Sequence, residues 1–271
     1  MSKTPQNPTS PPESHYPRDP AARERDPNFW TASHGRAVDP DVLPRVLSRA
    51  AALREQAVLV FDLDSTLLDN KPRQARIVRE AGQALGEPRL LGCQPEHFTD
   101  WSVDKPLRRL GLRDEEIPDL VPKVRRFWKQ RFFTSDYCVD DIAIAGAVAF
   151  VRDVLAAGSK VAYCTGRHEG MRQGTVACFA REGFPVPDGD RVHLLMKPDL
   201  ETHDDDFKVR ARQPLAALGT VIAAFDNEPI HINSYFVHFT DAQCVHMLTD
   251  DSARGIAPHQ SIPSIRDFRR G

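Results

Sequence analysis

Five short apolar segments constrain the fold of this chain more than any other feature of its sequence. They are Ala57–Phe61, Lys160–Cys164, Arg191–Met196, Thr220–Phe225 and Gln243–Leu248. Each has the length of a strand, and continuous hydrophobicity is typical of strands that are buried on both faces. Segments with helical periodicity separate them, at about 141–157, 168–181, 205–218 and 229–236. This alternation predicts an α/β fold, a Rossmann-like, doubly wound parallel sheet with helices on both faces.

The interval from 71 to 145 interrupts the alternation. It contains no convincing strand, but helical patterns occur at Ala75–Leu85 and Ile117–Phe132. An interval of this length is too long for a simple connection between two elements. We therefore expect a helical cap inserted at 71–145, with the core formed by residues 46–70 and 146–271.

Residues 1–45 differ in composition from the rest of the chain. Proline recurs through the first 27 residues, and it is incompatible with the interior of helices and with sheet ladders. We expect a disordered or loosely packed tail here, because the segment has little apolar surface to bury. A helical period of apolar residues starts at Asp41.

Charge and composition exclude several classes of protein. Lys and Arg total 36 and Asp and Glu total 38, which argues against broad nucleic-acid binding but leaves a local basic patch open. The longest nearly apolar stretch, Ile142–Val151, is far shorter than the ~20 residues of a membrane helix. The N-terminus lacks the apolar segment of a secretory signal, and the 5 cysteines form no CxxC pair. We expect a cytoplasmic protein with reduced thiols.

Two carboxylates, Asp62 and Asp64, directly follow the first apolar segment, and Ser-Thr-Leu-Leu comes after them. Open α/β sheets bind ligands at the carboxyl ends of their strands, and alternate residues of an extended chain share a side. An ionised aspartate is a ready nucleophile, and an acid beside it can move protons. The alternative is a structural pair that caps the following turn.

Two other apolar segments also end in polar residues. Thr165 and Gly166 follow one segment, and a hydroxyl with free backbone N–H groups before a helix suits a phosphate, although an ordinary helix cap has the same pattern. Asp226 ends another segment. Asp62, Asp64 and Asp226 would repel one another unless a cation lay among them, and Mg²⁺ suits an oxygen site that also holds phosphate.

A lysine could complete such a site, and the sequence offers two candidates. Lys197 lies just after an apolar segment, and Lys208 lies early in a helical pattern. A single lysine is usually a solvated surface charge, so neither position is informative without its context.

The order Asp-x-Asp-x-Thr, Thr-Gly, Lys and then Asp-Asn after a strand resembles the haloacid dehalogenase (HAD) superfamily of aspartate-dependent phosphohydrolases. The resemblance covers about residues 56–248. It implies that Asp62 is the nucleophile and Asp64 the general acid and base. It also implies that Thr165, Gly166 and a lysine bind the phosphoryl group, and that Asp62, Asp64 and Asp226 bind Mg²⁺.

The lysine motif and the insert add to the resemblance. Leu195–Lys208 resembles the version in which a Lys-Pro-Asp turn precedes the helix of the catalytic lysine, which favours Lys208 over Lys197. The place of the insert resembles a mobile C1-type cap. Its candidate substrate contacts are Trp101, Lys105, Arg108, Arg109, Arg125, Arg126 and Trp128. Many members have two adjacent acids in the last motif, whereas here Asn227 and then Glu228 follow, which leaves open whether Glu228 reaches the metal.

The resemblance implies a Mg²⁺-dependent phosphomonoesterase that acts through an aspartyl-phosphate on a small phosphorylated metabolite or nucleotide. A polynucleotide 3′-phosphatase or another phosphotransferase of the superfamily is the first alternative. A non-catalytic binding protein with the same fold is the second. No membrane partner is expected, and the sequence leaves the oligomeric state open.

Overall fold

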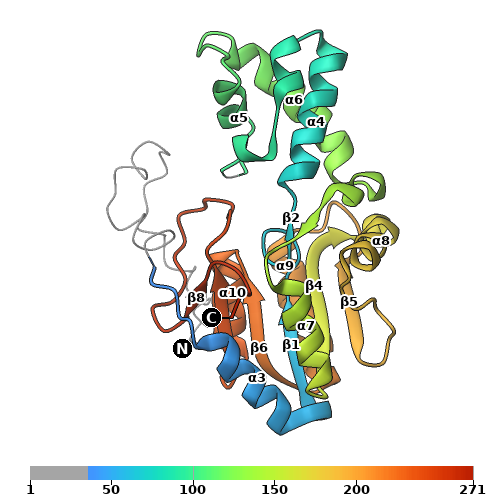
Figure 1. Ribbon diagram of the computed structural model, residues 1–271, viewed down its shortest axis with the longest axis vertical. Coiled ribbons are helices and arrows are strands. Elements are labelled where there is room, and N and C mark those ends of the chain that lie inside the picture. The colour runs from blue at the N-terminus through green and yellow to red at the C-terminus, as the bar shows by residue number, and fades with distance from the viewer. Residues whose placement is uncertain (1–35, 100, 271) are drawn as a thin grey trace, which may run out of the picture.

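The computed structural model describes residues 36–99 and 101–270. In these residues the main sheet has six parallel strands in the order β5-β4-β1-β6-β7-β8. The strands are β1 Ala57–Phe61, β4 Lys160–His168, β5 Val192–Lys197, β6 Thr220–Asp226, β7 Gln243–Met247 and β8 Ser264–Ile265. The parallel sheet with helices around it confirms the predicted fold class (Figure 1).

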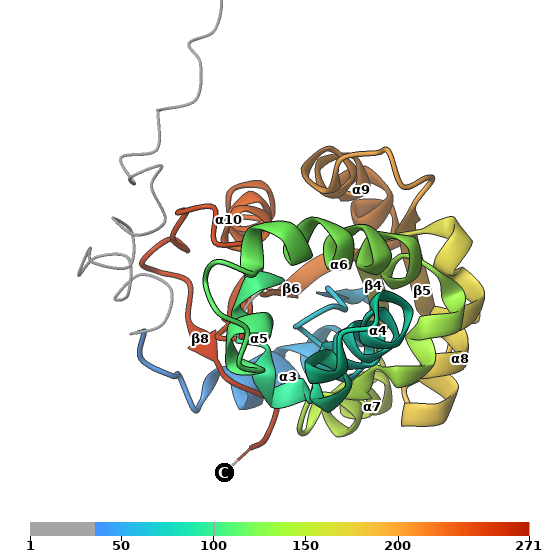
Figure 2. The ribbon, with the colours of Figure 1, turned by 90° about the horizontal axis from the view of Figure 1, so that it is seen from above.

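Helices cover both faces of the sheet, as Figure 2 shows. On one face lie α3 Val42–Leu53, α7 Ala147–Ala156 and α8 Arg172–Glu182, and on the other α9 Asp204–Leu218 and α10 Pro229–His238. Short 3₁₀ turns precede β1 and α8, at η1 Arg54–Gln56 and η5 Glu169–Met171. No helix in the described part of the chain is long and apolar enough to cross a membrane.

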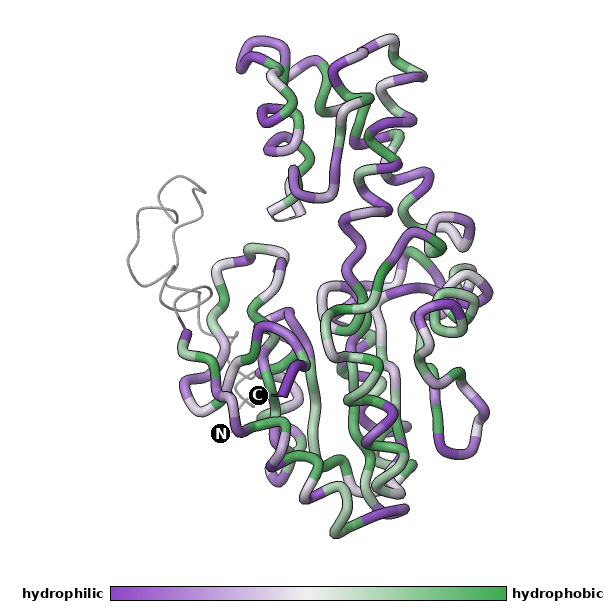
Figure 3. Tube along the Cα trace, viewed as in Figure 1, coloured by the Kyte–Doolittle hydropathy of each residue, from purple (hydrophilic) through white to green (hydrophobic). Residues whose placement is uncertain are grey.

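Strand β1 is buried along its whole length, which explains its continuous hydrophobicity. Leu59 and Phe61 pack into the cluster under α3 and α7, while Val58 and Val60 face α9 and α10. The ring of Phe61 stacks on that of Phe225, with centroids 4.9 Å apart. The tube in Figure 3 is correspondingly hydrophobic through the central strands. A strand this firmly packed holds its last residue, and whatever follows it, in a fixed place.

The insert is a helical unit above the carboxyl ends of the strands (Figure 1). It comprises α4 Lys71–Leu85, η2 Pro88–Gly92, η3 Pro95–His97, α5 Asp104–Arg109, α6 Ile117–Phe132 and η4 Ser135–Asp140. It has its own apolar cluster, in which Val78, Leu107 and Val124 are buried. A short antiparallel ribbon, β2 Leu68–Asp69 with β3 Ile142–Ala143, joins it to the core.

Three local expectations do not hold. The helix expected from Asp141 begins at Ala147, because β3 pairs with β2 and Gly146 turns the chain at φ 77°. The second core strand extends to His168, and helix α8 starts only at Arg172. Strands β2, β3 and β8 were not expected, and each is only two residues long.

The boundary of the N-terminal tail also differs. Residues 1–35 lie outside the described part of the chain. Residues 36–45, which we expected in the tail, pack on the core: the Arg36 Nε donates to Ser264 Oγ at 3.0 Å, and Val38 bridges to Ser264. Helix α3 begins at Val42. The apolar residues of this helix cover the sheet, and Val42 is therefore fully buried.

Gly174 allows α8 to pack closely on η4, the turn through which the chain leaves the insert. A Cβ at Gly174 would lie 2.1 Å from the carbonyl oxygen of Ser135. We expect Gly174→Ala to lower the free energy of unfolding by about 1–3 kcal/mol through this overlap. Equilibrium urea unfolding measures the change. Gly92→Ala is the matched control, since its Cβ would meet only Leu110 Cδ2 at 3.9 Å, and equal stability of the two variants would contradict the close packing.

Candidate active site

The ammonium group of Lys208 lies between two carboxylates at the carboxyl edge of the sheet. Its Nζ donates to Asp62 Oδ1 at 2.7 Å and to Asp226 Oδ2 at 2.9 Å, and also to the carbonyl oxygen of Cys164 at 2.7 Å. Lys208 is 2% exposed and Asp226 is fully buried. The structure thus brings together three of the residues that the sequence singled out.

Neighbouring strands place the two aspartates. Asp62 follows β1 and Asp226 ends β6, and these strands are adjacent and parallel, so their carboxyl ends meet. The backbone N–H of Asp62 donates to the carbonyl of Phe225 at 2.9 Å, which continues the pairing one residue beyond β1. Helix α9 brings Lys208 in from the side, in its second turn.

Burial and mutual charge shift the pKa values of all three groups. Burial raises the pKa of Asp62 to about 7, with Lys208 opposing and Asp226 adding to the rise. Burial acts to raise the pKa of Asp226 as well, but Lys208 and His231 outweigh it and hold that pKa below its usual range. Burial acts to lower the pKa of Lys208, and the two carboxylates raise it well above the ordinary value. The two carboxylates therefore favour the protonated form of Lys208.

The Asp64 carboxylate is held by arginines rather than by Lys208. Arg167 donates Nη2 to Oδ1 at 2.7 Å and Nε to Oδ2 at 2.9 Å, a bidentate pair, and Arg73 donates Nη2 to Oδ1 at 2.8 Å. Burial raises the pKa of Asp64, but Arg167 and Arg73 outweigh burial and hold it below its usual range. In this structure both oxygens of the Asp64 side chain are bonded to arginines. That Asp64 binds a metal beside Asp62 and Asp226 stays a prediction.

A second buried carboxylate completes this charge network. Asp141 Oδ2 accepts from Arg167 Nη2 at 2.6 Å, and Asp141 Oδ1 lies 3.0 Å from Arg73 Nε. Asp141 and Arg73 are fully buried, one in the return from the insert and one in its first helix. We did not identify either residue from the sequence. The available signal was a polar strip, Asn70, Arg73 and Gln74, at helical spacing beside the apolar face of α4.

The loop between the two motif acids and the insert is tightly determined. Ser65 has φ 59°, a left-handed conformation that is uncommon for a residue with a Cβ. Thr66 is fully buried, and its hydroxyl donates to Asn227 Oδ1 at 3.1 Å and accepts from the Asn227 N–H at 3.1 Å. The motif threonine therefore ties the end of β1 to the end of β6, which fixes Asp62 relative to Asp226.

The two phosphate-binding candidates of the Thr-Gly motif, Thr165 and Gly166, have different surroundings. Thr165 is fully buried inside β4, where its hydroxyl accepts from the Arg167 N–H at 3.2 Å. Gly166 lines the pocket, and a Cβ there would lie 2.7 Å from a carboxylate oxygen of Asp204. Asp204 in turn pairs with Lys197 at 2.7 Å. The structure thus places Lys208, and not Lys197, beside Asp62.

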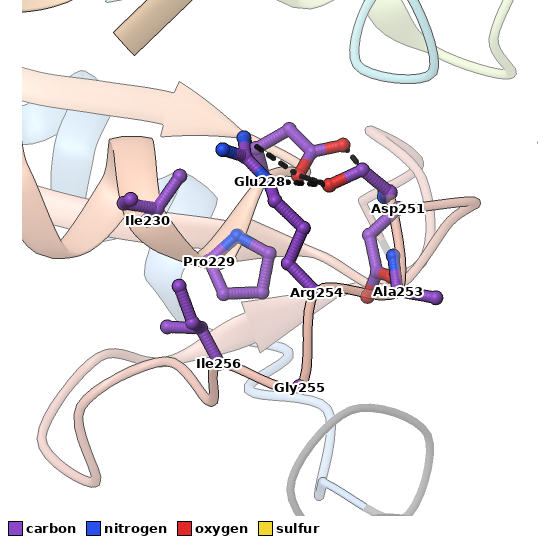
Figure 4. A pocket seen from close by; sticks show the side chains of 9 residues that line it. Glu228, Pro229, Ile230, Asp251, Ala253, Arg254, Gly255 and Ile256 are labelled. Atoms are coloured by element: carbon purple, nitrogen blue, oxygen red, sulfur yellow. Dashed lines mark hydrogen bonds and ion pairs between the residues drawn. The ribbon is translucent and has the colours of Figure 1, made fainter. Parts of the chain in front are cut away.

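Glu228 lines the pocket that contains Gly166, but its carboxylate is hydrogen-bonded to Ser252. It accepts from the Ser252 N–H at 2.7 Å and from the Ser252 hydroxyl at 2.6 Å, and Arg254 lies 3.8 Å away. Figure 4 shows this group turned toward the loop that carries Asp251 and Arg254. Arg254 also forms an ion pair of 2.7 Å with Asp205, which is bonded to His231. We did not predict a role for His231 from the sequence.

A pocket of about 240 Å³ opens above these groups, between the core and the insert. Its floor includes Asp62, Asp64 and Lys208. Its other wall is aromatic and comes from the insert: Trp101, Trp128, Phe132 and Phe133. The Nε1 of Trp101 donates to the carbonyl of Asp250 at 3.4 Å, so the insert contacts the core across the pocket. Of the seven substrate-contact candidates in the insert, the two tryptophans line it.

The donor set at Asp62 and Asp226 fits Mg²⁺ only as a partial site. Among residues 36–99 and 101–270, no group of three or more His, Cys, Asp or Glu side chains is arranged to hold a metal. Mg²⁺ is commonly held by one or two carboxylates, with water and substrate phosphate completing its six ligands. When both carboxylates are ionised, Asp62 and Asp226 with one lysine carry a net charge of −1, which would repel a phosphate dianion. Two carboxylates in a net negative site are therefore compatible with a divalent cation that arrives with phosphate.

The ion triad predicts a specific stability effect. Lys208→Met removes the ammonium group that lies between two buried carboxylates, and we expect a loss of about 3–5 kcal/mol in the free energy of unfolding at pH 8. The loss should be smaller at pH 5.5, because a carboxyl whose pKa is raised in the folded state binds a proton there and stability falls as pH rises through that pKa. Urea unfolding at both pH values tests this. The control Lys197→Met, whose partner Asp204 has a half-exposed side chain, should cost less than about 1 kcal/mol, and equal losses would contradict the assignment.

Comparison with known proteins gives structural similarities only. No family model and no curated protein matches the sequence. A HAD-superfamily hydrolase of subfamily IA from Geobacter sulfurreducens is 11% identical, with a TM-score of 0.49 over 80% of this chain and 94% of that chain. The protein tyrosine kinase A of Mycobacterium tuberculosis is 19% identical, with a TM-score of 0.48 over 78% of this chain and 93% of that one. A haloacid dehalogenase-like hydrolase from Bacteroides fragilis is 12% identical, with a TM-score of 0.47 over 78% and 97%.

Proposed function

We propose that this protein is a Mg²⁺-dependent phosphomonoesterase that uses Asp62 as its nucleophile. The single observation that carries the proposal is the buried triad in which Lys208 holds Asp62 and Asp226 at the floor of a capped pocket. The motif order that resembles the HAD superfamily supports the same reaction.

In the proposed reaction the Asp62 carboxylate attacks phosphorus, the bond from phosphorus to the ester oxygen breaks, and the leaving oxygen takes up a proton. Water then attacks the phosphorylated aspartate, which releases phosphate and restores Asp62. Lys208 lies 2.7 Å from the attacking carboxylate and can bind an equatorial phosphoryl oxygen. Asp64 lines the same pocket and is our candidate for moving the proton between the leaving oxygen and water.

Asp62 and Asp226 are the residues that would hold Mg²⁺. When bound, the ion neutralises charge on the phosphoryl oxygens and polarises the phosphorus toward attack. The net negative charge of the triad supports this part of the proposal, because a phosphate dianion needs additional positive charge to enter. Lys208 alone does not supply it, since both of its carboxylate partners already draw on its charge.

The position of the insert supports a compact substrate. The pocket of about 240 Å³ is bounded by the core on one side and by the insert on the other. A small phosphomonoester fits such a space, whereas a folded phosphoprotein or a long duplex would have to displace the insert. We therefore propose a small phosphorylated metabolite or a mononucleotide.

Replacement of the nucleophile gives the first test of function. We expect Asp62→Asn to lower the turnover of p-nitrophenyl phosphate by at least about a thousandfold while the far-ultraviolet circular dichroism spectrum stays unchanged, because the change is nearly isosteric. The control Asp190→Asn alters an exposed loop and should keep full activity. Turnover by Asp62→Asn within about tenfold of the parent, a barrier change of only ~1.4 kcal/mol, would overturn the assignment of the nucleophile.

Removal of metal gives the second test. After exhaustive EDTA treatment we expect hydrolysis of p-nitrophenyl phosphate to be lost and to return with Mg²⁺. Ca²⁺ should not restore it, because Ca²⁺ takes more ligands at longer distances and would misplace the phosphate. Asp226→Asn should raise the Mg²⁺ concentration needed for half-maximal activity. Full activity in EDTA would contradict the metal requirement. It would not affect the assignment of Asp62 as the nucleophile, which the Asp62→Asn variant tests.

A further inference from the structure

The pocket wall that the insert contributes is built from stacked aromatic rings. Trp128 lies one helical turn before Phe132 on α6, and their rings stack with centroids 4.2 Å apart at an interplanar angle of 18°. Phe133 meets Trp128 edge to face at 5.4 Å, and Trp101 meets Phe132 edge to face at 5.7 Å. The four rings therefore form one continuous aromatic wall.

This wall is anchored to the charged groups of the site. The Arg73 guanidinium lies 3.9 Å from the centre of the Phe132 ring, while its Nη2 donates to Asp64. His168 Nδ1 accepts from the Gly170 N–H, so its Nε2 carries the proton and donates to the carbonyl of Phe133 at 3.1 Å. The rings consequently have a defined position relative to the Asp64 carboxylate.

Three of the four rings are only partly buried. Phe132 is 4% exposed, whereas Trp101, Trp128 and Phe133 keep part of their surface accessible where they line the pocket. Apolar surface that is exposed to water costs roughly 25 cal/mol per Å² relative to its burial. A wall whose purpose was only to stabilise the insert would bury these rings in the apolar cluster around Val78 and Val124 instead.

The charges around the pocket restrict what can cover this wall. Among the described residues that line it, the cationic or titratable bases are Arg167, Lys208 and His231, and each is already bonded to a carboxylate. Four acids line the same pocket: Asp62, Asp64, Asp204 and Glu228. A second anionic group on a substrate would meet these acids without a free cation to bind it.

Resting on the proposed hydrolysis of a phosphomonoester, we propose that the leaving group carries a flat, uncharged aromatic ring that packs against Trp101, Trp128 and Phe133. The phosphoryl group lies at Asp62 and Lys208, and the ring fills the space below the insert. Sugar bisphosphates and nucleoside diphosphates are poor substrates, because among the described residues that line the pocket no cation is free to bind their additional charge. The site thus selects monophosphate esters of ring-bearing alcohols.

Two matched esters separate ring recognition from leaving-group chemistry. Benzyl phosphate and cyclohexylmethyl phosphate both release a primary alkoxide and have the same number of carbons, but only benzyl phosphate has a flat aromatic ring. We expect kcat/KM for the benzyl ester to be higher by roughly three- to tenfold, the range that corresponds to one aromatic pair beyond its area burial. Glycerol 3-phosphate, which has no ring, should be slower than both.

Variants in the wall test where the preference arises. Trp128→Leu keeps an apolar side chain but removes the ring face, and it should bring the ratio of the two kcat/KM values close to one. Trp101→Leu on the other side of the pocket is the second variant, in case Trp128→Leu fails to fold. Phe127→Leu is the matched control, because Phe127 lies on the same helix but outside the pocket, beneath Arg131. It should keep the parental ratio.

The outcomes distinguish this inference from the proposed function. Hydrolysis of both esters with a ratio below about twofold would overturn ring recognition and leave the phosphomonoesterase standing. The same holds if the ratio is unchanged in both tryptophan variants, since the preference would then arise elsewhere. Hydrolysis of neither ester, and of no p-nitrophenyl phosphate, would overturn the proposed function and this inference with it.

Discussion

The Lys208 ammonium is the interaction on which the functional end of this molecule depends. From helix α9 it joins the ends of β1 and β6 through Asp62 and Asp226, and it binds the middle of β4 through the Cys164 carbonyl. Without a cation, two buried carboxylates at adjacent strand ends would repel each other and favour a proton on one of them. The lysine thus keeps the carboxylates close together, which a site for phosphoryl transfer requires and which apolar packing alone would not permit.

A second set of charges connects this edge of the sheet to the insert. Arg73 belongs to the first helix of the insert and Arg167 to the core, and both bind the Asp64 carboxylate. Asp141, in the chain that returns from the insert, balances them. Two arginines and two aspartates at this junction are neutral as a group, so their burial is compensated. These hydrogen bonds connect the insert to Asp64. Asp64 therefore helps to set the angle at which the insert stands over the pocket, and it also lines the pocket floor.

Much of this arrangement could be predicted from the sequence, and what could not has a physical explanation. Continuous apolar segments identify β1, β4, β6 and β7, since only strands buried on both faces need them. The motif acids could be found because they follow such segments in a fixed order, and Lys208 because the Lys-Pro-Asp turn before its helix resembles a family motif. The partners of Asp64 could not be predicted from the sequence. Arg167 is 103 residues away from Asp64, and the pairing of the two depends on how the sheet and the insert meet. Strands of two residues, such as β2 and β8, are too short to show any periodicity, and the packing of residues 36–45 depends on side-chain contacts with the distant Ser264.

Charge and aromaticity have separate places in the pocket. The core supplies the carboxylates and the lysine at fixed strand ends, whereas the exposed rings come from the insert. The two sets are not independent, since Arg73 binds Asp64 with one nitrogen while its guanidinium lies over Phe132. A movement of the insert that carried the rings away from the floor would therefore also remove a cation from Asp64. Under the proposed function, such a movement would change the contact with the leaving group and the electrostatics of Asp64 together, because both depend on Arg73.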